Sequence, residues 1–507
     1  MATAEKLPFS WRDVEALPDL ERARLVLEVL PDEEIVAALE AGRGRGRNDY
    51  PVRAMWRALI AGVVFQHGSV QSLLRELGRN PALLEICGFD PLPYQSRPRA
   101  RSGGAPVTAL RAGLLLKAPA PLRSTVPSHW NFSRFLGRVV QLEGEQGLVS
   151  AMVESLRASL FAALPDFGRH LGYDGKAVAS HSTGRVGKDE GKTSDPDADW
   201  GKHETSGVNG KTGASPDRVR GRFWKKVKSW FGYGLHLIAD THYEVPVAFE
   251  VTRASASEPK VLSGMLEELF ARAPEMAGRC ADFSADRGLD DARLKARLWD
   301  RWAARPLIDT RLMWRVEKQE PGYDPKKPIT RPLFPDRADI VVHDERGRVS
   351  CVCPGTGEVR AMAFQGFEAD RGRCGTLKYR CPAAAFGFEC AGSRACHRAG
   401  GVKPGDYGRI LRIDLDSHDR RIFTPTPWGS PSWRRGYNRR TAMERINSRL
   451  DQAFNFETHY IRGRAKMKTR LGLALAVMMA MALAQARAGR PERMRSLVGA
   501  VPYLDTG

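Results

Sequence analysis

The sequence predicts a multidomain α/β protein, in which a helical N-terminal domain precedes a mixed-sheet core that is interrupted by a β-rich insertion. Three observations support this fold class. A chain of 507 residues is too long for one compact core. Helical periodicity dominates its first part, and short strands alternate with a helical stretch in its centre. A later stretch combines many prolines, short apolar runs and six of the eight cysteines, which favours β-rich structure.

Changes in composition give the expected boundaries between the parts of the chain. These parts are a helical N-terminal domain (1–90), a basic linker with helices (91–164), the first part of the core (165–310), the β-rich insertion (311–429), the second part of the core (430–490) and a tail (491–507). The sequence contains no internal repeat that would indicate a solenoid or an array.

The chain is strongly basic, with 79 Lys and Arg against 59 Asp and Glu, a net charge of +20 and a pI near 9.8. This excess predicts a polyanionic partner, with nucleic acid first and an anionic membrane surface second. The N-terminus lacks a basic region followed by an apolar core, so we expect no secretory signal, a cytoplasmic protein and reduced thiols. The apolar stretch from Leu471 to Ala486 is shorter than the ~20 residues that span a bilayer, and it predicts a buried helix.

Residues 49–89 are expected to form two or three helices. Gly68 breaks the first of them, and Ser69 is a suitable N-cap for the next. Two helices joined by a glycine turn fit a helix-turn-helix whose second helix enters a DNA groove. They fit a small bundle that only packs equally well, so both interpretations stay open.

The centre of the chain has mixed character. A short strand, HLGYDGKAVAS (170–180), precedes a polar, glycine-rich segment from His181 to Arg222 that is expected to be a flexible loop. Two strands joined by a turn at Asp240–Tyr243 follow, and then a helix that Pro259 opens and a strand that ends at Asp286. Strand, hairpin, helix and strand in this order predict a mixed α/β core.

Three acidic residues lie in a context that suggests chemistry. Asp174 and Asp286 lie at the ends of apolar strands, and Glu444 lies in a helix. Carboxylates at neighbouring strand ends converge at one edge of a sheet, where a packed helix can deliver a third. Such groups repel one another unless cations lie between them, and Mg²⁺ prefers these hard oxygen ligands. A turn or surface charge is the alternative for each, and Asp282 and Asp290 compete with Asp286, which is preferred because it ends its strand.

Tyr437, Arg440 and Glu444 are spaced three and four residues apart, so a helix would place them on one face, which suits a metal flanked by phosphates. Basic and aromatic residues also interleave before this helix and at 223–231, a pattern typical of phosphate contact with stacking on a base. The residues concerned are Lys225, Lys226, Lys228, Trp428, Trp433, Arg434 and Arg435. Core aromatics beside solvated charges are the alternative.

Together these motifs resemble those of the DDE transposases of bacterial insertion sequences, in which β-strands are inserted into an RNase H-like core. GYDGK (172–176) resembles the first Asp motif, SADRGLDD (284–291) the second, and YNRRTAMERI (437–446) the helix with Tyr, Arg and Glu. The hairpin at 230–258 and the N-terminal helices also resemble their counterparts in this family. The resemblance covers residues 50–490, and its motifs are specific in combination.

The resemblance implies that Asp174, Asp286 and Glu444 are catalytic and hold two Mg²⁺ or Mn²⁺ ions, and that Tyr437 and Arg440 contact the DNA backbone near the scissile phosphate. The implied reaction is hydrolysis at transposon ends, followed by attack of the freed 3′-hydroxyl on target DNA. The helical N-terminal domain would bind the terminal inverted repeats. A homodimer on double-stranded DNA is expected, because two ends must be held together.

Three positions depart from the family pattern. Leu289 stands where the second motif usually has Tyr, and Glu258 replaces an Asp that commonly follows the hairpin. Asp451 occupies a position expected to be basic, with Arg449 close by. The last departure leaves open a catalytically inactive, DNA-binding derivative of a transposase. Two further functions stay open, namely a nuclease without strand transfer and a membrane-surface protein that uses residues 471–486.

Six cysteines gather in the insertion, namely Cys351, Cys353, Cys374, Cys381, Cys390 and Cys396, followed by His397. A structural zinc ion needs four such ligands, usually with paired C-x₂₋₄-C spacing. The candidates for this zinc are Cys351, Cys353, Cys381, Cys390 and Cys396. The irregular spacing favours the alternative of reduced cysteines in a cytoplasmic β domain.

Overall fold

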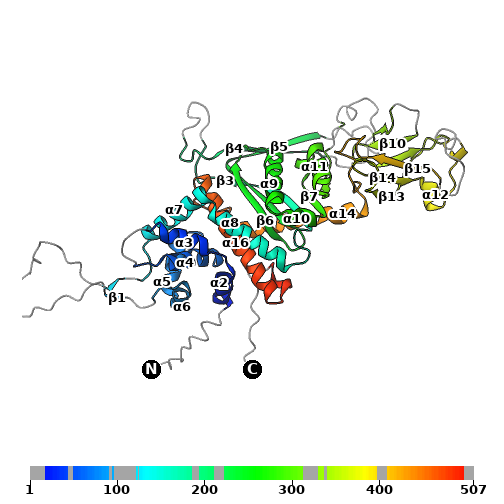
Figure 1. Ribbon diagram of the computed structural model, residues 1–507. Coiled ribbons are helices and arrows are strands. Elements are labelled where there is room, and N and C mark those ends of the chain that lie inside the picture. The colour runs from blue at the N-terminus through cyan, green and yellow to red at the C-terminus, as the bar shows by residue number, and fades with distance from the viewer. Residues whose placement is uncertain are drawn as a thin grey trace, which may run out of the picture. The chain divides into compact units, whose positions relative to one another are not determined.

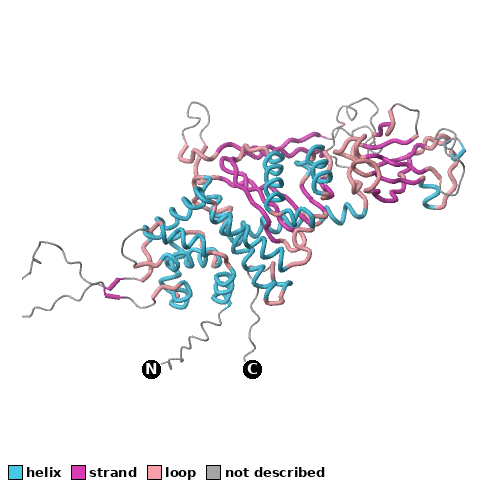
Figure 2. The backbone as a smooth tube through the Cα atoms, in the orientation of Figure 1, coloured by secondary structure: helices cyan, strands magenta, loops and turns pink. Residues whose placement is uncertain are grey.

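The computed structural model divides the chain into two compact units, one made of residues 1–163 and 449–507 and the other of residues 164–448. Figure 2 shows helices dominating the first unit, and strands concentrated in the second. This confirms the mixed α/β class and the helical N-terminal region. The residues described are 18–43, 49–90, 94–95, 122–123, 125–184, 193–209, 222–311, 314, 329–335, 340–394, 396 and 408–495.

The first unit is helical, apart from a short antiparallel pair of strands. Its elements are α2 (Pro18–Val29), α3 (Glu33–Ala41), α4 (Val52–Val64), α5 (Val70–Arg79), α6 (Pro81–Cys87), β1 (Tyr94–Gln95), β2 (Leu122–Arg123), α7 (His129–Gln146), α8 (Leu148–Ala163), α16 (Arg464–Arg487) and η3 (Pro491–Arg493). Three helices form within residues 49–89, as predicted. Ser69 caps α5, because its hydroxyl accepts a hydrogen bond from the N–H of Ser72 at 3.2 Å.

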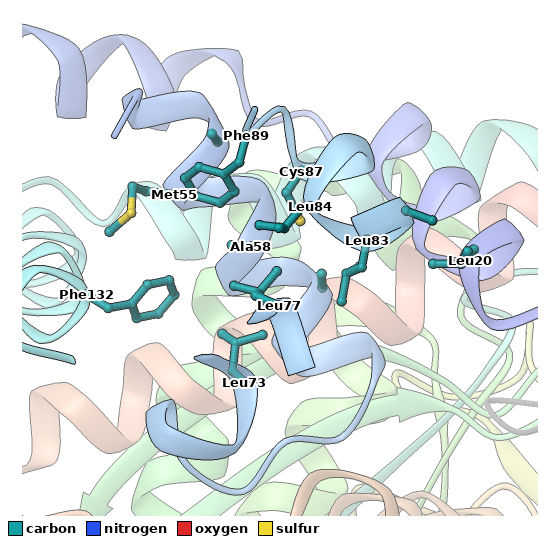
Figure 3. Close-up of a cluster of buried hydrophobic side chains, with 13 residues drawn as sticks. Leu20, Met55, Ala58, Leu73, Leu77, Leu83, Leu84, Cys87, Phe89 and Phe132 are labelled. Carbon is teal, nitrogen blue, oxygen red and sulfur yellow. The ribbon is translucent and has the colours of Figure 1, made fainter. Parts of the chain in front are cut away.

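Helices α4, α5 and α6 pack around a common apolar cluster (Figure 3). Leu73 and Leu77 contribute the buried face of α5, and Phe132 of α7 closes the cluster. Trp56 is fully buried in α4, and its indole N–H donates to the carboxylate of Asp32 at 2.6 Å. The helices thus form a packed bundle, and the entry of one of them into a DNA groove stays a prediction.

Helix α16 contains the apolar stretch for which a buried helix was expected. It is apolar on all sides and packs against α2, α4, α7 and α8, so its buried residues run from Leu471 to Ala484 without interruption. By length and composition it is also apolar enough to cross a membrane, and 83% of its most apolar stretch is buried inside the protein. The sequence grouped residues 430–490 with the core, whereas from Arg449 onward the chain belongs to the helical unit.

The second unit is built on a six-stranded mixed sheet (Figure 1). Its strands are β3 (His170–Ala179), β4 (Asp199–Asn209), β5 (Arg222–Asp240), β6 (Val245–Arg253), β7 (Asp282–Ala285) and β8 (Arg305–Ile308). The order is β4-β5-β3-β7-β8, and β6 also pairs with β5. β5 runs antiparallel to β3, β4 and β6, whereas β7 runs parallel to β3 and β8. Helices α9 (Glu258–Arg272), α10 (Pro274–Arg279) and α11 (Ala292–Trp302) and the short η2 (Arg287–Leu289) connect these strands.

The expectation of a flexible loop from His181 to Arg222 was wrong for residues 199–209 and for Arg222. Residues 199–209 form β4, and β5 begins at Arg222 rather than near Trp230. All eleven residues of β4 pair with β5. The sequence did not indicate this strand, because residues 199–209 lack the alternation of apolar and polar residues that marks a half-buried strand.

The insertion is rich in β-structure, as predicted. Its elements are β9 (Thr330–Pro332), β10 (Val341–Asp344), β11 (Val349–Val352), β12 (Val359–Ala361), β13 (Ala363–Glu368), β14 (Thr376–Arg380), α12 (Pro382–Phe386) and β15 (Ile410–Asp414). They form two antiparallel sheets, β12-β11-β10-β9 and β13-β14-β15, around one apolar cluster. The chain then enters α14 (Pro431–Asn438) and α15 (Thr441–Phe454).

Candidate active site

Two aspartates meet where the two central parallel strands stop pairing. Asp174 lies in the middle of β3 and not at its end, because β5 pairs with β3 as far as Ala179. The parallel partner β7 pairs only as far as Gly172, which lies opposite Ser284. Continuing this register by two residues aligns Asp174 with Asp286, the first residue after β7. The register therefore brings the two residues to neighbouring positions, and the charge of Asp286 is near enough to raise the pKa of Asp174.

The electrostatics of Asp174 reflect this neighbourhood. The pKa of Asp174 is raised to about 6, mainly because the carboxyl group is buried. The guanidinium of Arg440 opposes this, whereas the carboxylates of Glu258 and Asp286 add to it. A buried acid beside like charges is stabilised in its ionised form by a cation. Such a perturbed group marks a candidate functional site.

The two competitors of Asp286 have structural partners. Asp282 binds His170 Nδ1 at 2.8 Å and Arg439 at 2.9 Å, so it ties β7 to β3 and to the turn after α14. The side chain of Asp290 is fully buried and pairs with Lys295 Nζ at 2.6 Å. Asp286 is exposed, which favours it as the acid that faces a ligand.

Tyr437, Arg440 and Glu444 do not share one continuous helix, contrary to the prediction. Arg439 and Arg440 separate α14 from α15, and their N–H groups donate to carbonyls only three residues back. This turn is tighter than an α-helix, yet it keeps Arg440 next to both neighbours. Arg440 Nη2 donates to Glu444 Oε1 at 3.0 Å, and its guanidinium lies 5.7 Å from the ring centroid of Tyr437.

Arg440 is the cation common to the three predicted acids. Burial lowers the pKa of Arg440, but its interactions with Tyr437, Asp286, Glu444 and Asp174 raise it above its ordinary value. The Glu444 side chain is itself 60% exposed. Asp174, Asp286 and Glu444 therefore lie around one guanidinium, which already offers the kind of contact that a phosphate group accepts.

The donor set fits a divalent metal ion in part. Asp174 and Asp286 supply two neighbouring carboxylates, the type of ligand that hard cations prefer. Glu444 is held by Arg440 and does not join them. Within the described ranges, no group of three or more His, Cys, Asp and Glu residues could hold a metal ion. Glu444 would have to exchange Arg440 for a metal ion to complete the predicted triad.

Two side chains beside Asp174 were missed as site residues. Asn447 Nδ2 donates to Asp174 Oδ2 at 2.7 Å, and its position three residues after Glu444 is the helical spacing that would have indicated it. Glu258 opens α9, and a Cβ atom built on Gly175 would lie 2.6 Å from its Oε1. In the sequence, Glu258 is recognised only as a replacement for an Asp of the family pattern. In the structure, its carboxylate lies beside the backbone of Gly175, the residue that follows Asp174.

The aromatic residues before α15 are packed together. Trp433 is 7% exposed and stacks on Tyr437, with ring centroids 4.6 Å apart and an interplanar angle of 13°. Trp428 lies 5.6 Å from Trp433, and its indole N–H donates to Asp309 at 2.8 Å. This favours the core-aromatic alternative for Trp433, which orients Tyr437 instead of stacking on a base.

The predicted basic contacts lie at the surface where their side chains are described. Arg434 and Arg435 are exposed on α14, and Lys226 and Lys228 are exposed on β5. The side chain of Lys225 lies outside the described residues. These exposed cations are available for contact with a polyanion.

One pair of cysteines in the insertion is in contact. Cys353 Sγ accepts hydrogen bonds from the Thr356 hydroxyl, from the N–H groups of Gly355 and Thr356, and from the Cys390 thiol, and these bonds lower the pKa of Cys353 to about 7. Hydrogen bonds of this kind stabilise a thiolate, which is the form that binds a metal ion.

The other candidate thiols lie around this pair. Burial raises the pKa of Cys351 to about 11, and Cys381, Cys396 and Cys390 are near enough to raise it as well. All eight cysteines of the chain are free thiols. His397 lies outside the described residues. The five cysteines thus lie near one another, but among the described residues they do not form a group of three or more that could hold a metal ion.

Comparison with known proteins gives one match. The family model described as "Transposase domain (DUF772)" matches residues 13–97, which include helices α2 to α6. The match supports a transposase family for this chain. No curated protein and no solved structure matches it significantly.

Proposed function

We propose that this chain is a DNA transposase of the DDE type, which cleaves DNA at the ends of a mobile element and joins the 3′-hydroxyl to target DNA. The observation that carries the proposal is that Asp174 and Asp286 lie near each other, just beyond the paired part of the parallel strands β3 and β7. The transposase-domain match at residues 13–97 supports it independently, because that match lies in another part of the chain.

The arrangement of the sheet supports an RNase H-like core. Three antiparallel strands, β6, β5 and β3, continue into the parallel strands β7 and β8, and the first acid lies on the central strand β3. The insertion separates these strands from α15, which carries Glu444. This order agrees with the architecture that the resemblance implies.

In the proposed reaction, Asp174 and Asp286 would hold Mg²⁺ or Mn²⁺, and Glu444 would complete the set. Two such ions activate the attacking water or 3′-hydroxyl and stabilise the leaving oxygen. Asn447 orients the Asp174 carboxylate. Arg440 binds the phosphate when Glu444 leaves it, and the Trp433 stack holds Tyr437 beside the same phosphate.

The proposed partner is double-stranded DNA, both the terminal inverted repeats and the target. Arg434 and Arg435 extend the basic surface along α14. Lys226 and Lys228 form a second basic surface on β5. Lys225, in the same run of sequence, is proposed as a further DNA contact. Because two element ends must be held together, we propose a homodimer on DNA in the bacterial cytoplasm.

Cleavage of labelled DNA that carries the element's terminal repeats tests the function. With Mg²⁺ or Mn²⁺, we expect nicking at the repeat end, and Glu444→Ala should lower its rate by about 10²-fold, since one ligand of a charge-stabilising site contributes about 3 kcal/mol. Glu275→Ala, an exposed acid of α10 in the same unit, is the matched control and should cleave normally.

Three further results of this assay would favour a different function. Metal-dependent cleavage without joining of the 3′-end to a second duplex would favour the nuclease. Binding of the repeats without cleavage by wild-type protein would favour an inactive derivative, with Asp451 the first suspect. Failure of wild-type protein to bind DNA at all would overturn the proposed function.

We also propose a structural zinc ion in the insertion, held by thiolates from the set Cys351, Cys353, Cys381, Cys390 and Cys396. The contact between Cys353 and Cys390 and the N–H donors at Cys353 support it. We expect about one zinc ion per purified chain by elemental analysis. Cys353→Ser should lose this zinc, and Cys374→Ser, outside the proposed set, should retain it. Zinc-free wild-type protein with eight titratable thiols would favour reduced cysteines instead.

A further inference from the structure

Strand β5 is much longer than the sheet to which it belongs. It has 19 residues, but its pairing with β3 and β6 covers only the part from Gly232 to Asp240. Residues 222–231 pair with β4 alone. β6 pairs with β5 only from Tyr233 onward, so β4 replaces β6 as its partner before that residue. We call residues 199–209 with 222–231 the β4–β5 ribbon. At ~3.3 Å per residue, its ten β5 residues extend about 30 Å beyond the sheet (Figure 1).

Aromatic contacts are found at the base of the ribbon, where Trp200 contacts Phe231 with ring centroids 5.7 Å apart. Beyond this base, the described side chains of β5, residues 226–229, are all exposed. Lys226 and Lys228 lie on one face, with His203 opposite Lys228. Lys202 and Val227 belong to the other face, and Val227 is 48% exposed. A ribbon that packed on this protein would carry an apolar face. Its composition fits a polar, negatively charged environment.

The base of the ribbon is firmly attached to the sheet. At Gly232, which pairs with both β3 and β4, a Cβ atom would lie 2.2 Å from the carbonyl oxygen of Val178, so a larger residue would force the backbones apart. Ser255 donates its N–H to Asp199 at 2.9 Å, and Trp230 donates its indole N–H to the carbonyl of Tyr233 at 3.1 Å. The ribbon therefore keeps a defined direction relative to β3, which carries Asp174.

We infer that the β4–β5 ribbon enters a groove of double-stranded DNA and sets the position of that DNA relative to Asp174. The major groove of B-DNA is about 12 Å wide and admits a two-stranded ribbon. Lys226 and Lys228 then neutralise phosphates at its border. This inference rests on the proposed function and adds a binding surface distinct from the acid pair.

The double variant Lys226→Gln/Lys228→Gln tests the inference through the salt dependence of binding. Affinity for a labelled duplex is measured by fluorescence anisotropy over a series of KCl concentrations, without divalent metal. Each phosphate contact contributes about 0.9 to the slope of log K against log salt, so the slope should fall by about 1.8. Lys260→Gln/Arg293→Gln removes equal charge from exposed positions on α9 and α11, and its slope should equal that of the wild type.

An unchanged slope in the ribbon variant would overturn the inference, even if wild-type protein cleaves DNA normally. A reduced slope with no cleavage by wild-type protein would leave the ribbon intact and overturn the proposed chemistry, so the two failures are distinguishable. The edge of residues 222–231 could also pair with a second copy of the chain. A shift from dimer to monomer in the variant, with its DNA slope unchanged, would assign the ribbon to that contact and reject DNA.

Discussion

Asp174→Asn is expected to lower end cleavage by about 10³-fold or more while making the protein more stable above pH 6. The loss of activity follows from the proposed role of Asp174 as a metal ligand, since its charge-stabilising contribution amounts to several kcal/mol. The gain in stability follows from the pKa of Asp174, which is raised to about 6, mainly by burial. Active-site residues often lower the stability of the folded protein in exchange for activity, and Asp174 is expected to do so.

The sign of the stability effect comes from proton binding. The folded protein keeps the proton on Asp174 up to pH about 6, whereas the unfolded chain releases it near the ordinary value of 3.8. The folded state therefore binds more protons between these values, and its stability falls as pH rises through this window. The shift corresponds to at most about 3 kcal/mol, and we expect Asp174→Asn to gain about 1–2 kcal/mol at pH 8. At pH 4, close to the ordinary value of 3.8, most of the gain should vanish, because Asp174 is protonated in the folded state and partly protonated in the unfolded chain.

Urea unfolding of both proteins at pH 8 and pH 4, without divalent metal, measures this difference. Mg²⁺ or Mn²⁺ should then stabilise the wild type more than the variant, because the metal binds only the ionised site. Asp370→Asn, an exposed aspartate of the insertion, controls for the loss of one charge. A variant that is less stable than wild type at pH 8 would contradict the raised pKa, and one that cleaves normally would remove Asp174 from the catalytic site.

Lys295→Met is expected to destabilise the second unit by about 3 kcal/mol, because it leaves the charge of Asp290 buried without its main partner. The Lys295 and Asp290 side chains are 2% and 0% exposed, and Lys295 Nζ also donates to the carbonyl of Arg421 at 2.7 Å. Asp290 follows the loop that begins with Asp286. The pair therefore joins this loop to the chain that returns from the insertion, and its loss should also slow cleavage.

The double variant Lys295→Met/Asp290→Asn tests whether the loss of stability comes from the unpaired charge of Asp290. Asn removes the unpaired charge, so the double variant should be more stable than Lys295→Met alone. Arg421 also pairs with Asp290, at 3.3 Å, which limits the loss in the single variant. Equal stability of wild type and Lys295→Met in urea would show that the buried pair is unimportant.

Sequence patterns predicted the features that depend on interactions between residues close together in the chain. The N-cap at Ser69, the turn after Asp240 and the strand before Asp286 all depend on residues close in sequence, and the structure contains each of them. The β4 strand escaped prediction because its sequence, DWGKHETSGVN, lacks a regular alternation of apolar and polar residues. Asp174 was placed at a strand end because Gly175 and Lys176 ended the apolar run, whereas pairing with β5 continues β3 to Ala179.

The sequence by itself determined the basic charge, the apolar helix and the identity of the acids that the family motifs contain. Only the tertiary structure decided how they meet, because register and packing join residues that are distant in sequence. The parallel register of β3 and β7 aligns Asp174 with Asp286. The turn before α15 places Arg440 where its guanidinium donates a hydrogen bond to Glu444. Trp433 is buried because its ring stacks on Tyr437, and the sequence alone does not show whether this ring is buried or exposed to a base.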